Sequence, residues 1–213
     1  MAIGIISPTD MRFFELASES LLIVQQGNWD IYWALANEDP KIEFIKERIY
    51  IQSPASPIHE EIFRYLFVRI NHFLEQNELG RLIGSRFPIE LKDGKRAEPD
   101  ILFLSKKAIE KGSLTNKIFQ GSPTWIIEIV SPNYREHDTV TKRKEYCALN
   151  VGEYWIIDPE HKTIQVINFR NEKEIRNEII DSGEVSPRLE GFDDFFIEIE
   201  EFWLEVESKV SGN

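Results

Sequence analysis

The stretch TWIIEIVSPNYREHDTVTKRKEYCALNVGEYWIID, residues 124–158, decides the fold. It opens with a nearly continuous apolar run, Thr124–Val130, which is typical of a strand buried on both faces. Tyr134–Leu149 has the pattern of a helix, and Gly152 favours its end. Glu153–Asp158 is again strand-like. Strand, helix and strand in this order predict an α/β fold built on a buried sheet.

Upstream of this stretch, the pattern predicts a strand, a long helix and a hairpin. Ile42–Gln52 is rich in β-branched and aromatic residues, with a turn expected near Lys46. A helix is expected from about Pro57 to Gln76, because Ser56 is a good N-cap and an apolar stripe follows at helical spacing. The predicted hairpin joins strands 81–91 and 97–104 through a turn at 93–94. Downstream, 163–169 and 174–180 are predicted to pair antiparallel.

The chain contains no internal repeat or Gly/Ser linker, so its 213 residues predict one domain. We expect a helical lead-in over residues 1–30, a domain over 31–202 and a tail over 203–213. Cys147 is the only cysteine, which together with the lack of a signal peptide favours a cytoplasmic protein. No run approaches 18 apolar residues, so no membrane span is expected. The net charge of −12 argues against a nonspecific nucleic-acid coat.

Glu128 is the most informative residue, because it stands inside an apolar strand between Ile127 and Ile129. An ionised carboxylate there costs several kcal/mol unless something compensates it. A metal cation, a hydrogen-bond network or a strand end open to water would do so. A structural ion pair with an Arg or Lys is the alternative.

Two further elements join Glu128. Asp100 opens the apolar run 101–104, although a Pro-Asp pair alone signals only a turn. Asp138, Lys142 and Tyr146 follow at steps of four and share one helix face, although an ordinary solvated ion pair would look the same. Two acids on neighbouring strands with a lysine nearby suit phosphodiester hydrolysis. The acids can hold Mg²⁺ or Mn²⁺, and the lysine can orient or deprotonate a water or stabilise the transition state.

The pattern Pro99-Asp100 … Glu128 resembles the PD-(D/E)XK nuclease superfamily. The stretch from Glu128 to Pro159 is similar to the signature of the Uma-two family, a bacterial family of candidate restriction endonucleases. The resemblance covers roughly residues 31–202, and its matching positions are Glu128, Ser131, Pro132, Asp138, Lys142, Tyr146, Val151, Glu153, Tyr154, Trp155, Asp158 and Pro159.

This resemblance implies a restriction-endonuclease-like mixed β-sheet flanked by helices in a single domain. It implies a Mg²⁺- or Mn²⁺-dependent endonuclease acting on DNA, with Asp100 and Glu128 as metal ligands. Glu47 is carried over as an additional catalytic acid, with Glu60 and Glu61 as weaker alternatives. The resemblance also implies that Lys142 is the catalytic lysine and that His59, Asp138 and Tyr146 support the site.

The sequence departs from the superfamily at Val130, where a lysine would be expected, so we assign that charge to Lys142. A non-catalytic nucleic-acid- or protein-binding module that keeps the nuclease fold is the competing function, and a hydrolase of small phosphate esters is a third. A homodimer is a further expectation, since double-strand cutting needs two sites. We expect His72, His137 and His161 at the surface.

Overall fold

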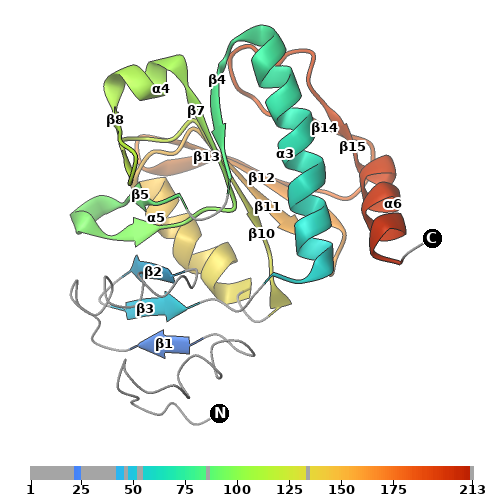
Figure 1. Ribbon diagram of the computed structural model, residues 1–213, viewed down its shortest axis with the longest axis horizontal. Coiled ribbons are helices and arrows are strands. Elements are labelled where there is room, and N and C mark those ends of the chain that lie inside the picture. The colour runs from blue at the N-terminus through green and yellow to red at the C-terminus, as the bar shows by residue number, and fades with distance from the viewer. Residues whose placement is uncertain are drawn as a thin grey trace.

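The computed structural model describes residues 22–24, 42–45, 48–51, 55–84, 87–132 and 135–211. Their central feature is a six-stranded sheet in the order β13-β12-β11-β10-β7-β4 (Figure 1). Its strands are β4 (Gly80–Ile83), β7 (Ile101–Ser105), β10 (Trp125–Ile129), β11 (Glu153–Asp158), β12 (Thr163–Arg170) and β13 (Lys173–Ile180). Only β10 and β11 pair in parallel, so the sheet is mixed.

Two long helices cover one face of this sheet. α3 (Pro57–Asn77) begins at Ser56, whose hydroxyl accepts a hydrogen bond from the backbone N–H of His59. α6 (Ile199–Val210) packs beside α3, as Figure 1 shows at the right of the molecule. The odd-numbered residues of β7 and β10, such as Ile101 and Ile127, point into this core. The apolar stripe of α3 therefore packs against the six-stranded sheet, as its helical spacing predicts.

The opposite face carries the helical segment after β10 and a second sheet. That segment begins with the π-helical turn η3 (His137–Lys142) and continues as α5 (Arg143–Ala148). The second sheet has the order β1-β3-β2-β6-β5-β9-β8. Its strands are β1 (Leu22–Val24), β2 (Ile42–Ile45), β3 (Arg48–Ile51), β5 (Ile89–Glu90), β6 (Arg96–Ala97), β8 (Ser113–Leu114) and β9 (Phe119–Gln120). Even-numbered residues such as Leu102 and Ile126 pack here.

The remaining elements are short. They are η1 (Lys92–Gly94), α4 (Lys106–Lys111), β14 (Glu184–Val185) and β15 (Ile197–Glu198). η1 is the predicted turn, where Asp93 and Gly94 have φ values of 60° and 73°. Among the described residues, no helix is both long and apolar enough to cross a membrane.

The structure corrects three predicted elements. The strand predicted over 81–91 is two strands, because β4 joins the six-stranded sheet and β5 joins the other. The predicted lead-in contains a strand, β1, and its other residues lie outside the described part of the chain. The predicted tail is the end of α6, which buries Trp203 and Val206 against the core. Each correction depends on contacts distant in sequence.

Candidate active site

The strand register places Asp100 and Glu128 together. β7 and β10 are antiparallel with Ile101 opposite Ile127, so Asp100 falls opposite Glu128 at the next position. Residues directly opposite each other point to the same face of a sheet. The backbone N–H of Ile129 donates to Asp100 Oδ2 at 2.9 Å, which holds the loop before β7 against β10. Both carboxylates therefore lie on the face that η3 and α5 cover.

Lys142 occupies the middle of a cluster of buried carboxylates. Its Nζ lies 3.0 Å from Glu128 Oε2, 3.1 Å from Asp138 Oδ1 and 3.2 Å from Glu43 Oε1. The Lys142 side chain is only 1% exposed. Burial disfavours the charged amine, but Glu128, Glu43 and Asp138 outweigh it and raise the pKa of Lys142 well above its usual range. Lys142 is therefore an ammonium ion that three carboxylates share.

The helical face predicted from the four-residue spacing is present. Tyr146, one turn beyond Lys142, donates its hydroxyl to Glu128 Oε1 at 2.6 Å. Asp138, one turn before Lys142, is buried, and burial raises its pKa, although Lys142 and His137 oppose that rise. Because these side chains come from η3 and α5, the helical segment presents its polar groups to Glu128. π-helical turns are frequent at functional sites.

His59 connects the start of α3 to the same region. Its Nε2 lies 3.2 Å from Asp100 Oδ2, across a separation of 41 residues. The ring is buried, and its Nδ1 lies 3.7 Å from Glu60 Oε1, beyond hydrogen-bond distance. The predicted supporting role thus has a defined geometry, in which His59 and the backbone N–H of Ile129 both hold one oxygen of Asp100.

Glu43 and His137 were not predicted as members of this site. Glu43, on β2, is 0% exposed and accepts from the backbone N–H of Glu98 at 3.0 Å. Its other oxygen lies 2.7 Å from His137 Nε2. The prediction that His137 lies at the surface is wrong, because its ring also stacks on Tyr50 of β3 at 3.9 Å.

One signal in the sequence could have found Glu43. It stands inside an apolar strand, Ile42–Ile45, as Glu128 does. Glu47, the acid predicted at this part of the site, lies outside the described residues. Of its two alternatives, Glu60 has a side chain that is 63% exposed, and Glu61 pairs with Arg64 on the solvent side of α3. Among the described residues, the N-terminal acid that contacts Lys142 is Glu43.

The donor set of the cluster fits a hard divalent cation. Glu43, Asp100, Glu128 and Asp138 supply carboxylate oxygens from four buried side chains. Oxygen ligands of this kind suit Mg²⁺ and Mn²⁺. In this structure the Lys142 ammonium lies at the centre of the cluster, where it contacts Glu43, Glu128 and Asp138.

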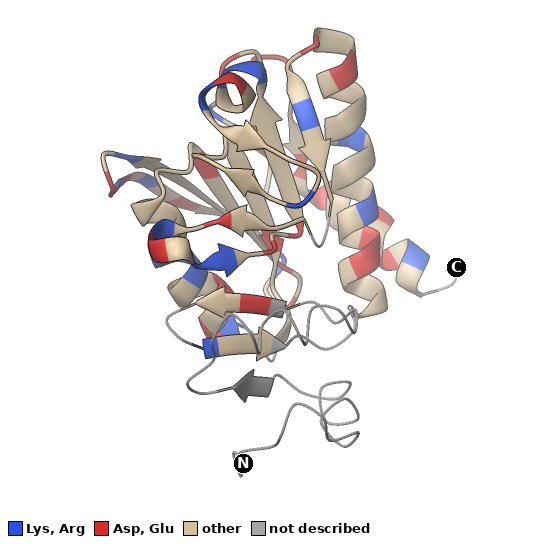
Figure 2. Cartoon of the chain, turned by 60° about the vertical axis from the view of Figure 1, so that its left-hand side comes forward, with Lys and Arg blue, Asp and Glu red and all other residues tan. Residues whose placement is uncertain are grey.

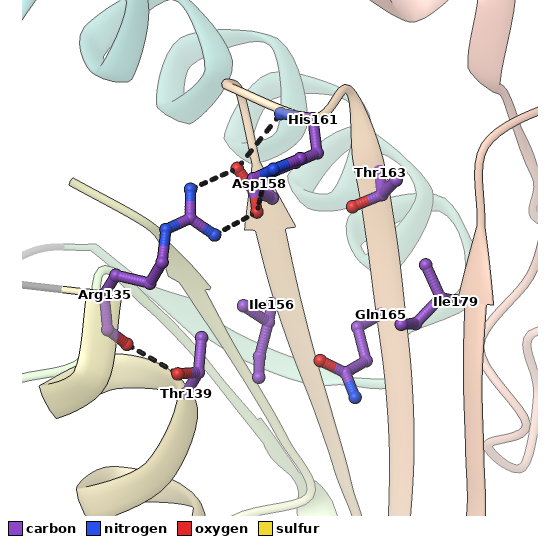
Figure 3. A pocket seen from close by; sticks show the side chains of 8 residues that line it. All are labelled: Arg135, Thr139, Ile156, Asp158, His161, Thr163, Gln165 and Ile179. Atoms are coloured by element: carbon purple, nitrogen blue, oxygen red, sulfur yellow. Dashed lines mark hydrogen bonds and ion pairs between the residues drawn. The ribbon is translucent and has the colours of Figure 1, made fainter. Parts of the chain in front are cut away.

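A second group of polar residues lies one strand away on the same face. It borders a cavity of about 380 Å³ with Ile156 and Ile179 as apolar lining and Arg135, Thr139 and Gln165 among its polar residues (Figure 3). Ile156 is opposite Glu128 in the parallel β10–β11 pair. The cavity is therefore adjacent to the carboxylate cluster.

Asp158 anchors the upper end of this cavity in the view of Figure 3. It accepts hydrogen bonds from Arg135 and His161, and Arg135 Nη2 also bonds Glu160 Oε2 at 2.7 Å. In the described part of the chain, only Asp158, Glu160 and His161 bring three ligand atoms within 4.8 Å of one another. Arg135 already pairs with both carboxylates of that trio.

The comparisons with known proteins place this arrangement in a family. Residues 29–200 match Uma2, a family described as "Putative restriction endonuclease". The chain belongs to the Uma2 family. No curated protein matches this Uma2 protein.

Two solved structures are similar to the Uma2 chain to different degrees. A protein from Anabaena variabilis described as a "putative nuclease" of DUF820 has a TM-score of 0.65 at 22% identity, over 78% of this chain and 92% of that one. The type IIG restriction endonuclease BpuSI is much less similar, with a TM-score of 0.34 at 12% identity, over 70% of this chain and 17% of that one. The predicted restriction-endonuclease-like α/β fold is confirmed.

Proposed function

We propose that this Uma2 protein is a metal-dependent endonuclease that hydrolyses DNA phosphodiester bonds. The observation that carries the proposal is the convergence of buried carboxylates from β2, β10 and η3 around Lys142, with Asp100 beside Glu128 at the start of the neighbouring strand β7. Burying several carboxylates together is costly unless cations compensate them. Family membership supplies the substrate class.

Asp100 and Glu128 would hold Mg²⁺ or Mn²⁺, because they lie opposite each other at the edge where β7 begins. When bound, the metal would supply an acidified water and neutralise charge on the phosphate. His59 and the Ile129 N–H orient Asp100, while Tyr146 orients Glu128. Ligands fixed in this way need little rearrangement to bind a cation.

Lys142 acts in this proposal as a cation. The neighbouring Glu128, Glu43 and Asp138 raise the pKa of Lys142, which favours its ammonium form, and this form would stabilise negative charge on the phosphate. Asp138 and Glu43 hold its ammonium in place at 3.1 and 3.2 Å. His137 in turn holds the other oxygen of Glu43.

One observation favours the second function, a non-catalytic binding module that keeps the nuclease fold. The carboxylates of the cluster are nearly closed to solvent, with Asp100 2% and Glu128 1% exposed. A cluster satisfied by Lys142 is also what a structural ion-pair network requires. Charges are interspersed on the surface, as the alternating red and blue segments of α3 show in Figure 2, so no basic stripe along α3 marks a DNA path.

Plasmid cleavage distinguishes these functions. Supercoiled plasmid is incubated with Mg²⁺, Mn²⁺ or EDTA and with wild type, Asp100→Asn or Glu128→Gln. The proposal predicts metal-dependent nicking by wild type and its loss in both variants, with Asp193→Asn, at an exposed position, as the active control. Wild type that never cuts plasmid would favour the binding module. Cutting of only a small chromogenic phosphodiester would indicate a hydrolase of small phosphate esters.

A further inference from the structure

β13 (Lys173–Ile180) is the outermost strand of the six-stranded sheet (Figure 1). Its eight residues pair on one side with β12, and no strand within the described ranges pairs with its other side. An unpaired edge strand of this length offers its backbone N–H and C=O groups to another chain. Natural proteins usually cover or interrupt such edges. The side chains of β13 indicate which kind of chain could pair with its free edge.

β13 combines this free edge with exposed apolar side chains. Ile175 is 57% exposed and Ile179 is 67% exposed, and each lies two residues from Asn177. Asn177 accepts a hydrogen bond from Gln165 of β12 at 2.7 Å, which fixes the centre of the strand. The register shift against β12 lies at Asn168/Phe169, so the segment from Arg176 onward is regular. Ile175 is the extra residue at this shift, because Asn168 pairs with Arg176 and Phe169 with Glu174, whereas Ile179 lies within the regular segment. The two exposed isoleucines therefore stand on either side of Asn177, one at the shift and one beyond it.

The sequence KEIRNEIID, residues 173–181, is complementary to itself when two copies pair antiparallel about Asn177. Ile175 then lies opposite Ile179, and Arg176 lies opposite Glu178. Lys173 lies opposite Asp181 at the ends, and Glu174 opposite Ile180 is the one pair that is not matched. Each apolar or opposite-charge pair across two strands contributes about 0.2–1 kcal/mol. Because the symmetry repeats every pair, one strand supplies both halves of a matching interface.

We propose that two copies of this chain associate through β13, edge to edge and antiparallel about Asn177. The two six-stranded sheets then form one continuous sheet, with the same face of each copy on the same side. In the monomer, Arg176 Nη2 bonds Glu178 Oε2 of its own strand at 2.6 Å. In the dimer, each Arg176 also faces the Glu178 of the second copy, so the charges of this edge are matched twice.

The dimer would also set the distance between two candidate active sites. This consequence rests on the proposed nuclease function, whereas the dimer itself does not depend on that function. Strand order places β10 three strands inward from β13. Seven strand spacings of about 4.8 Å therefore separate the two copies of Glu128, or about 34 Å along the sheet. This is close to one turn of B-DNA, about 34–36 Å. The two candidate active sites would then open on one side at a spacing suited to a duplex.

Mass measurement by analytical ultracentrifugation tests the dimer independently of cleavage. Wild type should sediment at twice its chain mass of 25.0 kDa. Ile175→Lys and Ile179→Glu should each sediment at 25.0 kDa, because each places a charge against an isoleucine twice in the interface. The double variant should recover the dimer, since each new lysine then faces a new glutamate. Leu204→Lys, at a 72% exposed position on α6, is the matched control and should remain dimeric.

The rescue keeps the test decisive, because a variant that merely misfolded would not regain its partner by a second substitution. Monomeric wild type would overturn the proposal. So would a dimer that persists in Ile175→Lys and Ile179→Glu, or one that Leu204→Lys abolishes. The last result would assign the contact to α6. A monomer that cuts plasmid would overturn the dimer while leaving the nuclease function standing, so the two failures are distinguishable.

Discussion

Replacing Lys142 by methionine tests whether one ammonium holds the carboxylate cluster together. Methionine keeps most of the length of the side chain and removes its charge. Three carboxylates lie within 3.0–3.2 Å of Lys142 Nζ, and the side chain is 1% exposed. Removing one partner of a buried ion pair costs about 3–5 kcal/mol, because it strands the other charge. For a chain of this length, that corresponds to a fall in melting temperature on the order of 10 °C.

The assay is thermal and urea unfolding of Lys142→Met in EDTA and in excess Mn²⁺. We expect the full loss in EDTA and a partial recovery in Mn²⁺, since a bound cation stabilises the folded state by about 2.7 kcal/mol at 100 times its Kd. Lys162→Met is the matched control. Lys162 pairs with Glu207 at 2.6 Å but is 52% exposed, so its loss should cost less than about 1 kcal/mol. The reasoning fails if Lys142→Met melts like Lys162→Met, or if Mn²⁺ stabilises it less than wild type.

Two further predictions concern the scaffold around the site. Burial raises the pKa of Asp158, but hydrogen bonds from Arg135 and His161 outweigh it and lower that pKa from 3.8 to about 2. The stabilisation is therefore fully present above the unfolded-state pKa of 3.8 and is lost as the pH falls through about 2. Asp158→Asn should cost about 1–2 kcal/mol at neutral pH in urea unfolding, and progressively less as the pH falls through about 2. Gly80 has a φ of 155°, and a Cβ there would lie 2.1 Å from the backbone oxygen of Leu104. Gly80→Ala should therefore destabilise the β4–β7 pair by at least about 1 kcal/mol, and a melt equal to wild type would show that β4 is placed wrongly.

The sequence predicted the centre of the fold because its signals there are local. The apolar run with Glu128 inside it gives β10, and the four-residue spacing of Asp138, Lys142 and Tyr146 gives the polar helix face. Both features depend on residues that are close along the chain. The prediction that Asp100 and Glu128 lie on neighbouring strands came from the resemblance, and the register of β7 and β10 agrees with it.

The missed parts of the site depend on contacts over long separations. Glu43 and His137 are 94 residues apart, and Glu98 is 55 residues from Glu43. Spacing along one element carries no information about such pairs. The end of α6 was taken for a tail because Trp203 and Val206 find their partners on α3 and the central sheet. The sequence therefore predicted individual helices and strands more readily than the way in which they pack against one another.

A calorimetric titration of Mn²⁺ tests the central claim most directly, because the claim is that Asp100 and Glu128 hold a metal. The account predicts saturable binding to wild type and to Asp193→Asn, with one ion per chain. It predicts that binding is lost or greatly weakened in Asp100→Asn and in Glu128→Gln, with both variants still folded by circular dichroism. Equal Mn²⁺ affinity in wild type and in folded Asp100→Asn would contradict the account.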